Sequence, residues 1–173
     1  RLDALTTTVP AVNDADSNGV LDNVDAAEAA VVAAEAAEQA LKDAIAGKGG
    51  IINPADKAGL DALKAAVDTA KGTAQGLVDA LPSTEQTAKD ALDARLDALT
   101  TTVPAVNDAD SNGVLDNVDA AEAAVVAAEA AEQALKDAIA GKGGIINPAD
   151  KAGLDALKAA VDTAKGTAQG LVD

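Results

Sequence analysis

The amino-acid sequence predicts an all-α protein built from tandem three-helix bundles. Apolar residues recur at steps of three and four positions over long stretches, as they do on the buried face of an α-helix. Alanine, the strongest helix former, is the commonest residue. The segment from Arg1 to Asp79 returns unchanged as Arg95 to Asp173, a period of 94 residues, and a repeat of that length is typical of a whole domain. We therefore predict two domains of a longer array, residues 1–81, in which the first helix is truncated, and residues 82–173.

The first helix of a repeat is complete only after Pro82. Ser83 to Gln86 resemble a capping box, which marks a helix start. Arg1 to Thr8 then correspond to the second half of the same helix in the preceding copy, and the threonines at 100–102 are expected at its frayed end. The apolar stripe predicts a helix that continues to Val103: Ala88, Leu92, Leu96, Leu99 and Val103.

The second helix is expected to begin at Leu21 or Val24 and to end at Ala46, before Gly47. Lys42 and Lys48 are expected near its carboxyl end, where the helix dipole favours cations. Its apolar stripe consists of Val24, Ala27, Val31, Ala34, Leu41 and Ile45.

The third helix is expected to begin with Asn53 as N-cap and Pro54 at the first helical position, and to end at Pro82. Its interior glycines, Gly59, Gly72 and Gly76, are expected on the surface or at close helix contacts. Short connections make neighbouring helices antiparallel, but the sequence does not decide whether helix one packs with its own repeat or with the preceding one. The apolar stripe is Leu60, Leu63, Val67, Ala70, Ala74, Leu77 and Leu81.

Composition excludes most catalytic functions and several kinds of binding. The chain has no His and no Cys, so it lacks the usual general base, the commonest zinc ligand and any thiolate. A formal net charge of -16 repels nucleic-acid phosphates and anionic membranes. No apolar run is long enough to span a bilayer. We expect a protein that is not an enzyme and that has no nucleic-acid partner, no membrane insertion and no small-molecule substrate.

An aspartate-rich segment between helices one and two has the spacing of an EF-hand loop. The segment Asp14 to Asp25, repeated as Asp108 to Asp119, fits the pattern D-x-[DN]-x-[DN]-G and ends in Asp where an EF-hand usually has Glu. Calcium requires hard oxygen ligands that converge from alternate loop positions. We therefore predict Ca²⁺, with Mg²⁺ ranked second, held by these residues: Asp14, Asp16, Asn18, the Val20 carbonyl, Asp22 and Asp25, and again Asp108, Asp110, Asn112, the Val114 carbonyl, Asp116 and Asp119.

The same residues have a simpler interpretation, because Asp, Asn, Ser and Gly are common in turns and at helix N-caps. The alternative is an Asx-rich turn that caps helix two without a metal. Only one loop occurs in each 94-residue period, whereas EF-hands usually work in pairs. A bound ion would therefore have a structural role rather than a sensing role.

The tandem helical repeat, the acidic composition without aromatic residues and the NDADSNGVLDN loop together resemble the stalk of giant secreted bacterial adhesins. These include RTX-type and biofilm-associated surface proteins, whose helical units resemble GA-like domains, and the loop is closest to dockerin-type loops. The resemblance implies an extracellular, cell-surface protein. Its repeats would act as a calcium-stiffened extender that projects a distal binding domain for adhesion or biofilm formation. It also implies a monomer whose partners are neighbouring repeats. A GA-like module that binds a host or partner protein is the alternative.

Overall fold

The computed structural model describes residues 11–173, and helices are their only regular secondary structure. The predicted all-α class is therefore confirmed. The predicted helix in Arg1 to Thr8 lies outside the described residues. The elements are α1 (Asp22–Ala46), α2 (Pro54–Asp79), the 3₁₀ turn η2 (Ser83–Glu85), α3 (Gln86–Asp97), α4 (Asp116–Ala140) and α5 (Pro148–Val172).

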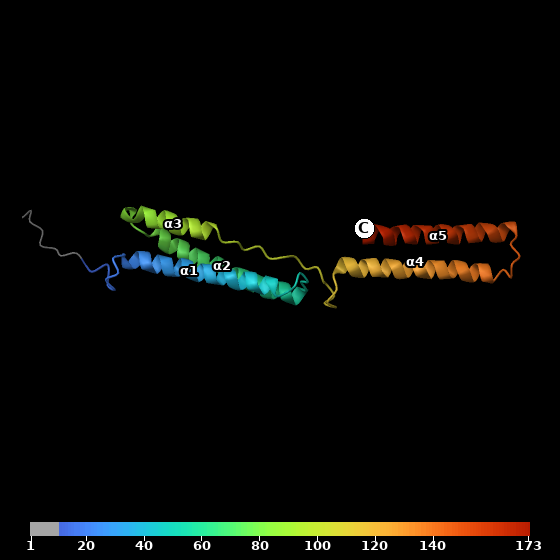
Figure 1. The fold of residues 1–173 in the computed structure, drawn as a ribbon, viewed down its shortest axis with the longest axis horizontal. Coiled ribbons are helices and arrows are strands. Elements are labelled where there is room, and N and C mark those ends of the chain that lie inside the picture. Colours follow the sequence, from blue (N-terminus) through green and yellow to red (C-terminus); the bar gives the residue numbers. More distant parts are fainter. Residues whose placement is uncertain (1–10) are drawn as a thin grey trace, which may run out of the picture. The chain divides into compact units, whose positions relative to one another are not determined.

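The first compact unit comprises residues up to Gly50 together with Ala55–Pro104, and it is a three-helix bundle. In Figure 1, α3 lies alongside α1 and α2. Small side chains fill most of its core, so the two leucines of α3 supply much of the bulk. The buried cluster is Val24, Ala27, Val31 and Ala34 of α1, Ala74 and Val78 of α2, Leu81, and Leu92 and Leu96 of α3.

The position of α3 answers the question of bundle phase. By sequence α3 belongs to the second copy of the repeat, beyond the predicted boundary after residue 81. By packing it belongs with α1 and α2, since Leu92 and Leu96 are 5% and 0% exposed in the same cluster as Val31 and Val78. The bundle of the first unit is therefore completed by the helix that begins the next copy.

The first helix of the repeat is shorter than its apolar stripe predicts. α3 ends at Asp97, and residues 99–115 form no helix, so Leu99 and Val103 lie outside it. The β-branched Thr100 to Thr102 and Pro104 account for this end, because both residue types disfavour a continuing helix. The predicted capping box is also absent: Ser83 lies in η2, and no side-chain cap bond precedes α3.

The predicted bounds of the second and third helices are close to those of α1 and α2. Within α2 the buried stripe differs from the prediction at one step, because Val78 is fully buried while Leu77 is 38% exposed. Lys48 lies just beyond α1 and forms an ion pair with Asp56 in the first turn of α2, so it links the two helices rather than capping one. A buried Glu38 in α1 was not predicted.

The second compact unit consists of residues 51–54 and Ala105–Asp173. Its helices, α4 and α5, form an antiparallel hairpin (Figure 1). Asn147 caps α5 through a reciprocal capping box with Asp150, and Pro148 follows as the first helical residue, as the sequence predicts for the equivalent Asn53 and Pro54. Among the apolar residues of α4 and α5, only Ala168 is buried.

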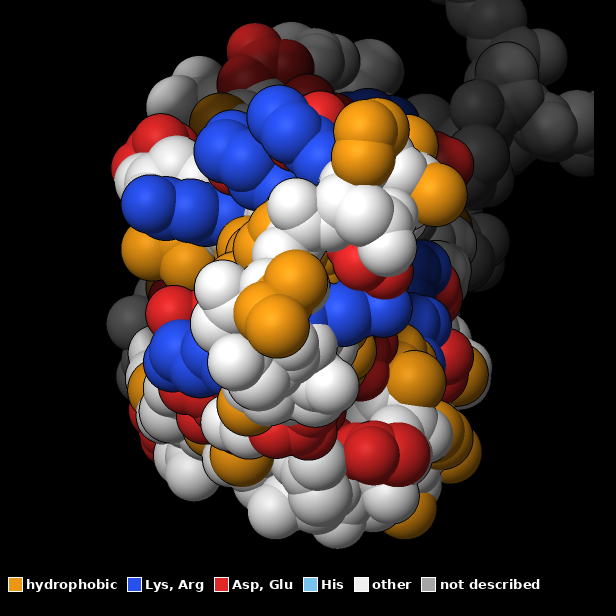
Figure 2. Space-filling view, turned by 90° about the vertical axis from the view of Figure 1, so that its right-hand side faces the viewer, with side chains coloured by type: hydrophobic (Ala, Val, Ile, Leu, Met, Phe, Trp, Pro, Cys, Tyr) orange, Lys and Arg blue, Asp and Glu red, His pale blue; other side chains and the backbone are white. Residues whose placement is uncertain are grey.

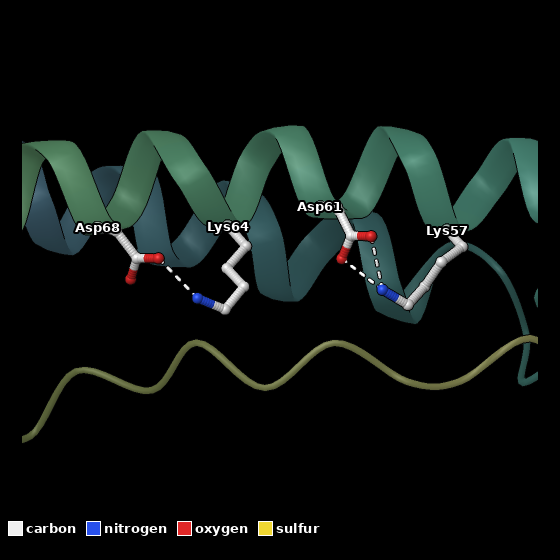
Figure 3. Close-up of polar contacts among 4 residues, drawn as sticks. All are labelled: Lys57, Asp61, Lys64 and Asp68. Atoms are coloured by element: carbon white, nitrogen blue, oxygen red, sulfur yellow. Dashed lines mark hydrogen bonds and ion pairs between the residues drawn. The ribbon is translucent and has the colours of Figure 1, made fainter.

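Charged pairs one helical turn apart line the exposed faces. On α2, Lys57 contacts both carboxylate oxygens of Asp61, at 2.5 and 2.6 Å, and Lys64 contacts Asp68 at 2.6 Å (Figure 3). Such pairs stabilise a helix by about 0.2–0.5 kcal/mol each. On the face shown in Figure 2, basic side chains lie beside acidic ones, and the hydrophobic side chains form small separate groups.

The interior glycines of α2 are surface residues. Gly72 and Gly76 have no heavy atom within 4 Å of the position a Cβ would take, and both are exposed. Neither helix packing nor a turn requires glycine there, so each is an interior helical glycine without a compensating contact.

We predict that Gly72→Ala raises the free energy of unfolding by about 0.5–1 kcal/mol, because alanine loses less backbone entropy in a helix. Urea unfolding followed by circular dichroism measures the change. Gly113→Ala is the control: its φ of +86° is unfavourable for any residue with a Cβ, so this variant should be destabilised. A destabilised Gly72→Ala variant would contradict the open surface described here.

Candidate functional site

The two aspartate loops lead directly into α1 and α4 and have nearly the same backbone. Each contains two residues with positive φ, Ser17 at 61° and Gly19 at 86° in the first loop, and Ser111 at 62° and Gly113 at 86° in the second. The glycine is at the predicted sharp turn of the loop, where the left-handed region is inexpensive only for glycine. The chain thus reverses tightly between Asp16 and Val20, and again between Asp110 and Val114.

The first aspartate of each loop organises this turn. Asp14 accepts hydrogen bonds from the backbone N–H groups of Asn18 and Gly19, both at 3.1 Å. Asp108 accepts the equivalent bonds at 3.0 and 3.2 Å. Wrapping of a loop around its first carboxylate is a property of Asx turns and is also required of a cation-binding loop.

The later aspartates join the loop to the helix that follows. Asp22 accepts a bond from the N–H of Ala15 at 2.9 Å, and its own N–H donates to the Asn13 carbonyl at 2.9 Å. The residue that precedes α1, Leu21, makes no side-chain cap bond. The turn in the metal-free alternative is therefore present, but its helix cap is not, because the aspartates bond back into the loop.

Carboxylate oxygens converge in the second loop. Asp108, Asp110 and Asp116 each offer an oxygen, and these three oxygens lie within 4.8 Å of one another. The amide nitrogen of Asn112 lies between two further oxygens, at 3.1 Å from Asp110 and 3.0 Å from Asp119. The loop thus brings together hard oxygen donors of the kind that divalent cations prefer.

The first loop has equivalent hydrogen bonds around its amide. Asn18 donates to Asp16 at 3.0 Å and to Asp25 at 3.1 Å, and it accepts a bond from the N–H of Val20 at 2.7 Å. Val114 donates the equivalent bond to Asn112 at 2.7 Å. All the predicted side chains therefore lie in one loop network in each copy. Occupancy by calcium stays a prediction.

The two loops differ in burial although their sequences are identical. Asp108 is only 2% exposed, whereas Asp14 is half-buried. Within the second unit, the backbone N–H groups of Asn107 and Asp108 donate to the Ile52 carbonyl at 3.0 and 3.2 Å, and Ile52 N–H donates to the Asn107 side chain at 2.7 Å. No periodic pattern links positions 55 residues apart, so the sequence could not reveal this pairing.

Polar contacts hold α3 on α1 and α2. Arg95 of α3 forms a two-bond pair with Glu35 of α1, through Nε to Oε1 and Nη2 to Oε2, both at 2.8 Å, and Nη1 lies 3.6 Å from Glu28. The bond to the guanidinium keeps the pKa of Glu35 below its ordinary value. Gln75 of α2 donates to Asp93 of α3 at 2.8 Å. These residues fix both the rotation and the height of α3.

Glu38 was missed because a glutamate between Ala37 and Gln39 in an alanine-rich helix is typical of a solvated position. It is 8% exposed and accepts bonds from the backbone N–H of Thr100 at 2.6 Å and from its hydroxyl at 2.9 Å, while Lys42 lies at 2.8 Å. The Lys42 ammonium and the Thr100 N–H lower the pKa of Glu38 from 4.5 to about 2. The charged form therefore fastens the end of α3 to α1.

The helical repeat has a family match. The model of the GA-like domain matches residues 24–117 and 118–173, which together cover most of the chain. The chain belongs to the GA-like domain family. Its two adjacent GA-like matches agree with the helical-bundle architecture and fit a surface protein-binding module.

Searches of the curated proteins and of the solved structures gave no match. Among the described residues, no helix is long and apolar enough to cross a membrane.

We predict that Glu38 makes the stability of the GA-like bundle sensitive to acid. Since folding lowers the pKa of Glu38 from 4.5 to about 2, its contribution is present above pH 4.5 and is lost as the pH falls toward 2. Glu38→Gln should therefore cost about 1–2 kcal/mol at neutral pH and flatten the loss of stability over that window. Urea unfolding at several pH values measures both effects.

The matched control is Glu132→Gln at the equivalent position of the second copy. Glu132 is exposed and pairs with Lys136 at 3.0 Å on the surface of α4, so this variant should keep the acid dependence of the parent protein. Equal behaviour of the two variants would contradict the role given to Thr100.

Proposed function

We propose that this chain is a structural extender of a bacterial cell-surface adhesin, made of serial helical bundles with a calcium ion in each aspartate loop. The observation that carries the proposal is the packing of α3, which belongs to the second copy by sequence and completes the bundle of the first. Each copy then depends on the next for its core. Such a dependence suits a serial array better than a set of independent binding domains.

Identical copies support a mechanical role. Residues 1–79 and 95–173 have the same sequence, so no single copy carries a distinctive binding residue, and the property that grows with copy number is length. The α1 and α2 helices have 25 and 26 residues, which corresponds to about 40 Å at 1.5 Å per residue. Each added copy would extend the array by an increment of that order if bundles follow one another end to end.

The aspartate loops supply the proposed stiffening. In the second loop Asp108, Asp110 and Asp116 would hold Ca²⁺, joined by Asn112, Asp119 and the Val114 carbonyl. An ion there would offset two of the four negative charges crowded at the start of α4 and tie the loop to that helix. Because Asp116 and Asp119 lie in the first turn of α4, binding would limit the motion of the chain that leads into the helix. An extracellular location, where calcium is plentiful, fits this proposal.

A protein-binding module is the second candidate. Membership of the GA-like family favours it, and so do the exposed valines of the second unit, Val125 at 40% and Val126 at 62%. The chain has no aromatic residue to anchor such an interface. The two functions call for different tests. Growth of length with copy number tests the extender, and capture of a partner by a single copy tests the binding module.

We predict that Ca²⁺ raises the thermal unfolding midpoint and that a chelator reverses the rise. Saturation at about 100 times the dissociation constant corresponds to roughly 2.7 kcal/mol at one site. The double variant Asp14→Ala, Asp108→Ala should lose the calcium response, because both loops then lack their organising carboxylate. Circular dichroism melting with calcium, magnesium and chelator measures the effect.

The control is the double variant Asp43→Ala, Asp137→Ala, which removes two exposed helical aspartates at equivalent positions outside the loops. It should keep the full calcium response. A melting curve of the parent protein that ignores calcium would reject the metal and leave the turn alternative.

We predict that chains with two, four and six copies of the repeat grow almost linearly in maximum dimension, by about 40 Å or more for each copy. Small-angle X-ray scattering with calcium present measures this dimension. A dimension that grows only as the cube root of mass, as for a compact globule, would reject the extender and favour the binding module.

A further inference from the structure

The two copies of the repeat provide an internal comparison of the same surface with and without a third helix. Val31 and Val78 are fully buried under α3 in the first unit. Their equivalents 94 positions later, Val125 and Val172, are 40% and 65% exposed. Val31 and Val125 have the same sequence on both sides, so the difference in their burial reflects the contact with α3.

A groove runs along α4 and α5 at the place that α3 occupies in the first unit. An apolar hollow of about 210 Å³ is lined by residues of both helices. Every one of these residues has an equivalent on α1 or α2, and most of those equivalents lie in the α3 contact. The lining consists of Val125, Ala128, Glu129, Lys165, Ala168, Gln169 and Val172.

The charges beside the groove match those that receive α3. Glu122 and Glu129 correspond to Glu28 and Glu35, which contact Arg95 at 3.6 and 2.8 Å. Glu132 lines a neighbouring hollow and corresponds to Glu38, which binds Thr100. Gln169 corresponds to Gln75, which binds Asp93. The groove therefore offers apolar positions for two leucines and carboxylates for one arginine and one threonine.

We infer that the groove between α4 and α5 is the docking site for one more helix of the α3 sequence, supplied by the segment that follows Asp173 in a chain with a further copy of the repeat. The inference deepens the proposed function and rests on it only in taking the repeats as a serial array. It requires no calcium.

A second copy of this chain is a poorer occupant on energetic grounds. Its α3 already buries Leu92 and Leu96 against its own α1 and α2. Moving this helix into another groove would expose in its own bundle as much apolar surface as it buries in the new one. A helix of the same sequence without a bundle of its own has no such cost. The connection also fits, because Asp173 is the equivalent of Asp79, which α3 follows after a short link.

The test adds a synthetic peptide with the sequence of residues 80–102 to the 173-residue protein in the presence of chelator. We expect one peptide to bind per chain and to slow hydrogen exchange in α4 and α5, with little change in α1 and α2, where α3 already lies. Isothermal titration gives stoichiometry and affinity, and exchange with mass spectrometry locates the site.

Variant peptides separate the specific contact from unspecific adhesion. Leu96→Asp should abolish binding, because it places a charge in the apolar hollow. Arg95→Glu should weaken binding by about tenfold or more, equivalent to roughly 1.4 kcal/mol. The chain variant Glu129→Arg should restore affinity for the Arg95→Glu peptide. Binding that ignores all three changes would overturn the inference.

A tethered version covers the case of a peptide too weakly helical to bind in trans. Residues 80–102 are appended after Asp173, once as they stand and once with the substitutions Leu92→Asp and Leu96→Asp. We expect slower hydrogen exchange in α4 and α5 of the chain with the unchanged segment, and no such protection in the chain with the two substitutions. No protection in either chain would overturn the inference, and a parent protein that dimerises through Val125 would assign the groove to a second copy. Either failure leaves the scattering result of the extender untouched.

Discussion

The bundle of the first unit depends on one contact, the burial of the two leucines of α3 between α1 and α2. Apart from Leu81, the buried side chains that face them are valines and alanines, which each remove less apolar surface from water, so the leucines contribute a large share of the hydrophobic stabilisation. A core without aromatic residues leaves little reserve if this contact is lost. Polar contacts then fix the position of α3 along α1, which burial alone would not determine. They are the ion pair between Arg95 and Glu35 and the bonds from Thr100 to Glu38.

The chain carries an excess of negative charge. With 29 acidic and 13 basic residues, the chain has far more carboxylates than ammonium groups to pair them. Lys57 and Lys64 of α2 lie one turn before Asp61 and Asp68, where each pair supports its own helix. Eight of the 29 carboxylates lie in the two loops, four in each. Their mutual repulsion makes these loops the places where a divalent cation would release the most electrostatic free energy.

Much of the helical structure could be predicted from periodicity, because Val24, Val31 and Leu41 recur at helical steps and Pro54 marks a start. The loop spacing likewise predicted which aspartates lie together. The apolar stripe extended α3 to Val103, although Thr100 to Thr102 and Pro104 disfavour a longer helix, and Leu99 packs on the core from outside the helix. Other predictions failed where tertiary contact decides. The burial of Glu38 was missed because its partner, Thr100, is 62 residues away and beyond the end of α3. The pairing of Ile52 with Asn107 was missed for the same reason, since the two are 55 residues apart.

The repeat therefore specifies its helices locally but its core only together with the next copy. Val31 and Val125 have the same neighbours in sequence and differ in exposure by 40 percentage points, because only one of them lies under a third helix. In such an array each added copy completes the copy before it and opens a new groove, so the free energy of folding contains a nearest-neighbour contribution for every junction. The acidic side chains that border the groove of α4 and α5 make an arginine-bearing helix its natural complement.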